Sequence, residues 1–273
     1  MSATTTGMAQ TLPSRRIIDM RVDATSYGDA TERIVRWADA RESRSVFIAT
    51  VNNVMEAHED RSFLDVMNGS DLTTPDGMPL VWGLKILGVK EATRVYGPDL
   101  TPNVMRAAAE RGVPVGFYGG SPATLEILLE RVRSEFPGLE VAFHESPPFR
   151  EITADEDVAT VERVAASGAR VLFIGLGCPK QERWIADHRG RIPAVMVGVG
   201  AAFDFLAGTK RQAPKLLQRF GLEWLFRLAS EPRRLWRRYL RHNPRFVALF
   251  ARQVLVGRRQ APRVADPRSM GDE

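Results

Sequence analysis

Polar side chains recur in this sequence at points where a short apolar run gives way to a turn. The clearest example is residues 73–82, where Pro75, Asp76 and Gly77 force a turn between a short strand and an apolar helix. A carboxylate held there can accept a proton from an attacking hydroxyl, bind a sugar hydroxyl, or cap the helix. Capping is the commoner role for a lone Asp at a turn. Comparable junctions carry further polar residues, and this grouping favours a shared site: Thr50, Asn52, Arg94, Asp99, Lys180, Gln181 and Glu182.

Several of these junctions suggest an anionic ligand. Arg94 presents a planar fork of N–H donors that suits a phosphate or a carboxylate. Lys180 and Gln181 come at the start of a predicted helix, where the helix dipole disfavours a basic side chain unless an anion is bound nearby. Gly119 and Gly120 separate a predicted strand from a helix and would let backbone N–H groups approach a phosphate. Helix capping is the alternative explanation for three of the polar residues, Asn52, Asn53 and Asp99.

The spacing of apolar residues predicts strands and helices in alternation. Runs rich in branched and aromatic residues are typical of buried parallel strands, and they occupy 45–50, 71–74, 114–118, 139–143, 170–174 and 194–199. An opening strand at 16–22 precedes them, and helical patterns fill 27–41, 54–68, 101–111, 123–136 and 155–167. This order predicts an α/β fold with a doubly wound, mostly parallel, Rossmann-like sheet and a cleft along its carboxyl edge.

Composition limits the chemistry and the location. The only cysteine, Cys178, excludes an internal disulfide and any multi-cysteine metal site, and it suits a reducing cytoplasm. We assign it a packing role. The four histidines lack the spacing of metal ligands. Residues 1–13 have no apolar core of a secretory signal and are predicted to be a disordered leader, and the most apolar run, 192–208, is too short to span a bilayer.

The charge distribution sets the C-terminal part of the chain apart. Residues 205–259 hold fourteen arginines and lysines but only two acids, Glu223 and Glu231, whereas the whole chain carries a net charge of +5. Around Leu235 and Trp236, arginines fill the remaining helical positions and predict a basic amphipathic helix. Such a helix suits an anionic membrane surface. Nucleic acid would match the charge as well, but we expect the membrane to be the partner.

These patterns divide the chain into four parts. We expect a disordered leader (1–13), an α/β core (14–208), a basic helical appendage that docks on membranes (209–259) and a disordered tail (260–273). Within the appendage, Pro214, Pro232 and Pro244 separate three predicted helical stretches, and the residues around Pro232 and Pro244 are typical of helix starts.

Several short motifs resemble, in order and spacing, the WecG/TagA/CpsF glycosyltransferases, which form glycosyltransferase family 26. The resemblance extends over residues 16–246, and the motifs are specific when taken together. Residues 145–149 depart from the family pattern by replacing a loop that is more often glycine-rich, and Pro98 stands where a small polar or branched residue is usual. The motifs are Thr50-Val51-Asn52, Thr74-Pro75-Asp76-Gly77, 94–100 (RVYGPDL), 175–182 (GLGCPKQE), 198–208 (GVGAAFDFLAG), Ala213-Pro214, 222–227 (LEWLFR) and 231–234 (EPRR).

This resemblance implies an inverting transfer of a hexosyl unit from a UDP-sugar to a saccharide on polyprenyl diphosphate. The reaction would take place at the cytoplasmic face of the cell membrane, in the synthesis of a cell-surface polysaccharide. In that family the aspartate matching Asp76 is the proposed general base, and the threonine matching Thr50 lies close to it. Asn52 would position substrate. Contacts to nucleotide or sugar are implied for Arg94, Asp99, Lys180, Gln181 and Glu182, and contacts to a diphosphate for Arg227, Arg234 and Arg237.

We expect catalysis without a metal or another cofactor, because the many arginines can meet the charge that grows on the departing UDP. The strongest alternative is a non-catalytic nucleotide-binding α/β module with an arginine-rich tail on nucleic acid. A dinucleotide-dependent oxidoreductase is disfavoured, since the sequence has no GxGxxG motif. The sequence does not identify the donor sugar, the acceptor saccharide or the oligomeric state. A homo-oligomer is one of the states it allows.

Overall fold

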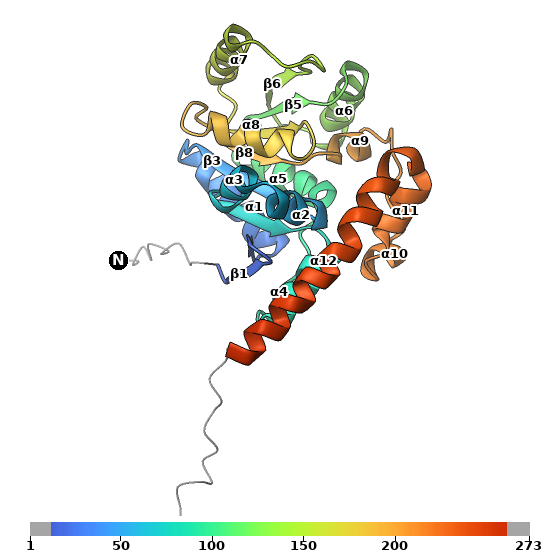
Figure 1. Cartoon of the computed structure of the whole chain (residues 1–273). Helices are drawn as coiled ribbons and strands as arrows, with labels where there is room; N and C mark the ends of the chain where they lie inside the picture. The colour runs from blue at the N-terminus through green and yellow to red at the C-terminus, as the bar shows by residue number, and fades with distance from the viewer. Residues whose placement is uncertain (1–11, 261–273) are drawn as a thin grey trace, which may run out of the picture.

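A computed structural model describes residues 12–260 of the chain, with side chains up to residue 257. Six strands form a sheet in the order β4-β3-β8-β7-β5-β6 (Figure 1). All neighbouring strands are parallel, so their carboxyl ends lie along one edge. The strands lie within two residues of their expected bounds: β3 (Arg44–Ala49), β4 (Leu72–Pro75), β5 (Val115–Gly119), β6 (Val141–Glu145), β7 (Val171–Gly175) and β8 (Val195–Gly198).

Helices cover both faces of this sheet, which confirms the doubly wound fold. Side chains along β7 show the division, because Leu172 and Ile174 enter one core cluster while Val171 and Phe173 enter the other. The first cluster is completed by α2 (Val51–Glu59), α3 (Arg61–Asn68), α7 (Ala154–Ser167) and α8 (Lys180–His188). The second is completed by α1 (Tyr27–Asp39), α5 (Gly97–Arg111), α6 (Pro122–Glu135) and α9 (Ala202–Leu206).

The N-terminal part differs from expectation at residues 16–22, which are not one strand. β1 (Ser14–Ile17) and β2 (Met20–Asp23) form an antiparallel hairpin outside the main sheet. The chain turns at Ile18, whose φ of 61° lies in the left-handed region that interrupts an extended strand. The flanking residues Ile17 and Met20 are both fully buried, so the hairpin contributes to the core from both of its strands.

The helix expected at 54–68 is also divided, because α2 ends and α3 begins at Asp60. The Asp60 carboxylate accepts a hydrogen bond from the Phe63 N–H at 3.2 Å and serves as the N-cap of α3. Helical periodicity continues across this boundary, and so the sequence pattern alone did not reveal the break.

After residue 208 the chain forms α10 (Lys215–Arg219), α11 (Glu223–Ser230) and α12 (Pro232–Gln260). α12 crosses α4 (Met78–Ile86), where a Cβ on Gly83 would lie 3.4 Å from the Phe250 ring (Figure 1). Pro232 begins α12 as predicted, but Pro244 lies inside this helix and does not start a new one. Burial of Leu235 and Phe246 on either side of Pro244 accounts for this, because packing can outweigh the ~3 kcal/mol cost of an internal proline.

Two expectations fall at the ends of the chain. The disordered leader (1–13) and tail (260–273) lie outside the described residues, apart from Leu12, Pro13 and Gln260. Between residues 12 and 260, no helix combines the length and the apolar character needed to cross a bilayer.

Candidate active site

Strand pairing brings two of the predicted site residues together. β3 and β4 are parallel neighbours in which Ala49 is paired with Pro75, so the residues that follow, Thr50 and Asp76, lie side by side at the carboxyl edge. The Asp76 N–H donates to the Ala49 carbonyl at 2.9 Å and fixes the backbone there. Asp76 does not cap α4, because the N-cap of that helix is Gly77. Its carboxylate instead faces the cavity.

The helix after β3 is also capped differently from expectation. Thr50 is the N-cap of α2, and its N–H and hydroxyl both donate to Asn53 Oδ1, at 3.0 and 2.8 Å. Neither Asn52 nor Asn53 is the cap. Asn52 lines the cavity, and its Nδ2 donates to Cys178 Sγ at 3.4 Å. Cys178 packs against the core, and burial raises the pKa of its thiol.

Arg94 connects Asp76 to the appendage. Its Nη2 lies 3.1 Å from Asp76 Oδ1 and 2.5 Å from Glu223 Oε2, and its Nε donates to the Asp76 carbonyl oxygen. The guanidinium also stacks over Tyr96, 4.2 Å from the ring centroid. Burial disfavours the charge of Arg94, but the two carboxylates outweigh it and raise its pKa, so this side chain stays charged.

The surroundings of Asp76 make it a stronger base than an ordinary aspartate. Burial raises its pKa, Arg94 lowers it and Glu223 raises it, with a resulting pKa of about 6. The carboxylate is therefore ionised at neutral pH but holds a proton more tightly than usual. A pKa close to neutral pH suits a general base.

The loop after β7 carries predicted residues of two kinds. Lys180 is exposed at the start of α8 and lines the cavity. Gln181 and Glu182 are buried, with 4% and 0% of their surface exposed. Gln181 accepts a hydrogen bond from the Gly177 N–H at 3.1 Å and donates one to Glu182 at 3.0 Å. Their polar groups thus bind one another within the wall of the cavity.

Three predicted residues are not brought to the cavity wall. Asp99 is exposed on α5 and accepts a hydrogen bond from the Tyr27 hydroxyl at 3.2 Å. Arg237 is exposed on α12 and is outside the set of lining residues. Gly119 has a φ of 122°, and a Cβ there would lie 2.6 Å from the Gly175 backbone, so close strand approach requires glycine. Gly120, the next residue, does line the cavity.

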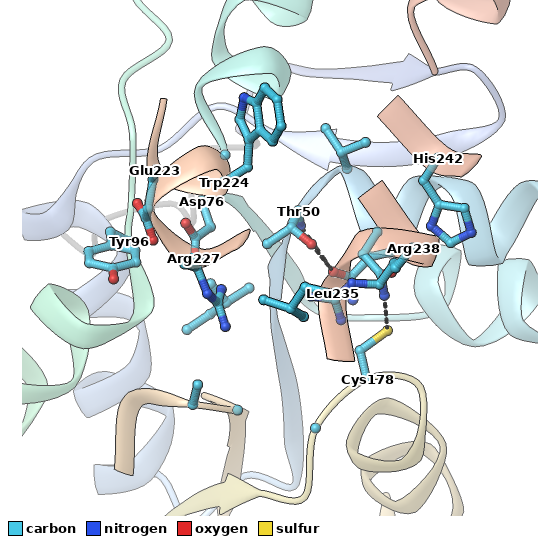
Figure 2. Close-up of a pocket in the computed structure, with 18 of the residues that line it drawn as sticks. Thr50, Asp76, Tyr96, Cys178, Glu223, Trp224, Arg227, Leu235, Arg238 and His242 are labelled. Atoms are coloured by element: carbon cyan, nitrogen blue, oxygen red, sulfur yellow. Dashed lines mark hydrogen bonds between the residues drawn. The ribbon is translucent and has the colours of Figure 1, made fainter. Parts of the chain in front are cut away.

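The appendage supplies the opposite wall. Arg227 of α11 and Arg234 of α12 line the cavity, as do Arg238 and His242, which the sequence patterns did not single out. In Figure 2, Asp76 and Glu223 lie at one end of the site, Arg238 and His242 at the other, and Thr50 between them. Glu223 also went unpredicted, although a signal existed, since it is one of only two acids in a strongly basic segment.

The two walls enclose an open cavity of about 1560 Å³. This exceeds the roughly 300–1,000 Å³ of a pocket for one small ligand. The part of the cavity between Asp76 and His242 is polar and cationic. A second part is apolar, where exposed side chains of α4 and α12 line it: Trp82, Ile86, Val247 and Leu255. The loop that departs from the family pattern also lines the cavity, through Pro147, Pro148 and Phe149.

A metal site is a separate question. Within the described part of the chain, no group of three or more His, Cys, Asp and Glu side chains is arranged to hold a metal ion. The run Asp155-Glu156-Asp157 has two aspartates one residue apart, a spacing that can hold a metal, but it lies in the first turn of α7 and outside the cavity wall.

A model of the glycosyl transferase WecG/TagA/CpsF family matches residues 15–260. A curated protein of Bacillus spizizenii strain W23, N-acetylglucosaminyldiphosphoundecaprenol N-acetyl-β-D-mannosaminyltransferase, is 34% identical over 202 residues. That alignment covers 73% of this chain and 76% of the relative. The match to the family model extends over both the core and the appendage.

Proposed function

The chain belongs to the WecG/TagA/CpsF family of glycosyltransferases, and we propose that it transfers a hexosyl unit from a UDP-sugar to a saccharide on polyprenyl diphosphate. The transfer would invert the anomeric centre and serve the synthesis of a cell-surface polysaccharide. The name of the Bacillus relative supports a lipid-linked acceptor that ends in N-acetylglucosamine. A large cavity with an apolar part is consistent with such an acceptor.

Asp76 is the general base in this proposal, and its position carries the assignment. It is a carboxylate with a pKa of about 6, beside Thr50, in the wall of a cavity lined by cationic side chains. The acceptor hydroxyl would lose its proton to Asp76 as its oxygen attacks the anomeric carbon and the bond to UDP breaks. Attack from the face opposite the leaving group inverts the anomeric centre.

The departing UDP carries growing negative charge, and cationic side chains would meet it without a metal. Lys180, Arg227, Arg234 and Arg238 line the cavity from both walls. Arg94 is largely buried between two carboxylates, whereas Arg234 is exposed and pairs with one acid of the appendage, Glu231. Lys180, Arg227, Arg234 and Arg238 are therefore the candidates for the diphosphates of donor and acceptor. Positioned positive charge of this kind stabilises the transition state most strongly when water is excluded.

We place the protein on the inner face of the cell membrane through the appendage. α12 exposes Trp236 and Leu240 together with several arginines. Aromatic, aliphatic and basic side chains on one helix suit the boundary of an anionic bilayer. Closure of the appendage over the core would then be favoured where the lipid-linked acceptor is found.

One assay tests this function. The wild-type protein is given a panel of UDP-hexoses and a short-chain polyprenyl diphosphate carrying N-acetylglucosamine, with and without EDTA. We expect transfer from one donor, with product of inverted anomeric configuration and no loss of rate in EDTA. Transfer that requires an added metal would refute the metal-free mechanism. No transfer from any donor, together with stabilisation of the fold by RNA or NAD rather than UDP, would refute the glycosyltransferase proposal.

A further inference from the structure

A short chain of hydrogen bonds runs behind Thr50, and backbone N–H groups fix its direction. The Thr50 N–H can only donate, so the atom of Asn53 that faces it at 3.0 Å must be the oxygen Oδ1. In the same way, the Gly177 N–H at 3.1 Å must face the Oε1 of Gln181. The main chain therefore decides which way both side-chain amides point.

The two amide nitrogens then meet at one carboxyl oxygen. Asn53 Nδ2 and Gln181 Nε2 each lie 3.0 Å from Glu182 Oε1 and donate to it. Asn53 is 2% exposed and Glu182 is 0% exposed, so both act from inside the protein. Burial raises the pKa of Glu182 while the amide hydrogen bonds oppose that rise. Oε1 can accept both hydrogen bonds whether the carboxyl group is ionised or protonated.

This direction settles the role of the Thr50 hydroxyl. Asn53 Oδ1 has no proton, so the hydroxyl that lies 2.8 Å from it must be the donor. A hydroxyl has one proton to give and two lone pairs. One lone pair faces the Asn53 backbone N–H in the capping box of α2. The other is left for the cavity, which Thr50 lines beside Asp76 (Figure 2).

We propose that Asn53 and Glu182 are positioning residues that hold the Thr50 hydroxyl as a hydrogen-bond acceptor for an O–H or N–H group of a substrate sugar. The proposal rests on the function proposed above. The attacking hydroxyl has a single proton, which goes to Asp76, so Thr50 accepts from a different group. A neighbouring hydroxyl or the N–H of an acetamido group has the required proton, whereas a phosphate or a carboxylate has none at neutral pH.

The same chain of bonds assigns Glu182 a role different from the substrate contact that family resemblance implies. Its side chain has no exposed surface and acts through Asn53. Lys180, only two residues earlier, is exposed to the cavity. The Pro-Lys-Gln-Glu run therefore supplies one side chain to the ligand and two to the support of Thr50.

The first test combines variants with substrate analogues. Thr50→Val removes the hydroxyl at nearly constant shape, and Thr50→Ser keeps it. Each protein is assayed with the donor and acceptor identified above and with analogues that each lack one hydroxyl or amide N–H. We expect wild type and Thr50→Ser to lose about tenfold in kcat/KM with one particular analogue, the worth of one hydrogen bond. Thr50→Val should have the same kcat/KM with that analogue as with the parent substrate. If every analogue lowers kcat/KM by the same factor in Thr50→Val as in wild type, the Thr50 hydroxyl accepts a hydrogen bond from neither substrate.

The second test addresses the support. Glu182→Gln keeps an oxygen where Oε1 lies, and Glu182→Met removes every acceptor at nearly the same volume. We expect Glu182→Gln to retain the discrimination between the parent and that analogue, and Glu182→Met to lose it as Thr50→Val does. A merely structural role would lower melting temperature and total activity without changing this ratio between substrates. Equal discrimination in the two variants would overturn the role of Glu182.

A third measurement is independent of turnover. In the wild-type protein, the Asn53 side-chain NH₂ protons should show nuclear Overhauser effects to the Gln181 side-chain NH₂ protons, since both groups converge on Glu182. Effects from the Asn53 NH₂ protons to the Thr50 amide proton alone would mean that the amide points the other way and would overturn the inference. This readout holds even if no UDP-sugar is transferred, so failure of the proposed function is distinguished from failure of the hydrogen-bond chain.

Discussion

The two walls of the cavity are held by different physical means. In the core wall, Thr50 and Asp76 are fixed by parallel strand pairing and by backbone hydrogen bonds. In the appendage wall, α10 and α11 contain no buried residue. Their link to the core includes a half-buried polar contact, in which Arg94 binds Gln218 at 3.2 Å and Glu223 at 2.5 Å.

The last helix is intermediate between these extremes. Leu235, His242 and Phe246 of α12 are buried, and Gln253 exchanges two hydrogen bonds of 2.7 Å with the backbone of the β1–β2 hairpin. α12 is thus attached at both ends, while α10 and α11 are connected to it and held mainly by polar contacts. Segments with little buried apolar surface open at low free-energy cost. The core should therefore set the chemistry, and the appendage should respond to substrate and membrane.

The largest effect should come from the core wall. Asp76→Asn removes the proposed base, and general-base help contributes roughly 10² to 10⁴ in rate. We expect kcat to fall by that factor with little change in KM. Asp99→Asn is the matched control, since Asp99 follows a similar junction but is exposed outside the cavity wall. Steady-state transfer assays measure both, and a kcat for Asp76→Asn within threefold of wild type would exclude Asp76 as the base.

The appendage should dominate membrane binding. Arg233, Arg237 and Arg252 are exposed on α12, and each basic residue near anionic lipid contributes about 1 kcal/mol. Changing all three to Gln should weaken binding to phosphatidylserine-containing liposomes by roughly 100-fold in a sedimentation assay. The control changes Arg36, Arg41 and Arg133, which are exposed on the core. Equal losses in the two triple variants would mean that only net charge matters and that the appendage has no special role.

The core could be predicted from sequence to a greater extent than the appendage. The placement of Thr50 and Asp76 at one site could be predicted because apolar runs indicate strands, and parallel strands bring their carboxyl ends to one edge. Glu223 and Arg238 were missed because they reach the site only through the docking of helices far along the chain. Two helix boundaries were predicted wrongly. The expected helix 54–68 is divided at Asp60, which caps α3, whereas α12 continues through Pro244, where a new helix was expected. Local patterns report local structure, and tertiary packing decides which of them prevail.

A stability cost should accompany the function of the core wall. Asp76 has a raised pKa of about 6 in the folded protein, against about 3.9 in an unfolded chain. The folded state therefore binds more protons between these values, so stability contributed by this group falls as pH rises from about 4 to about 6. Asp76→Asn removes the ionisation and should be more stable than wild type at pH 7 by up to about 3 kcal/mol. Urea unfolding at pH 7 and pH 4 measures this, and the advantage should disappear at pH 4. A less stable variant at pH 7 would contradict the burial argument.

The smallest effect should appear where the two walls touch. Glu223 raises the pKa of Asp76, while Arg94, which stacks over the Tyr96 ring, lowers it. Glu223→Gln removes a negative charge near Asp76. It also leaves Asp76 as the one carboxylate paired with Arg94, and both changes lower the pKa of Asp76. The acid limb of the kcat/KM profile, which should lie near pH 6 in wild type, should therefore move to lower pH. Because a base of lower pKa removes a proton less readily, the rate on the plateau should also decrease.

Glu231→Gln is the control for this variant. Glu231 is the other acid of the appendage, and it pairs with Arg234 and Lys210 rather than with Arg94. We expect its acid limb to coincide with that of wild type. If Glu223→Gln also leaves the limb in place, α11 does not lie over Asp76 in the working enzyme, and the two walls function separately. A shift in Glu223→Gln alone would mean that the appendage, although loosely held, tunes the base that the core positions.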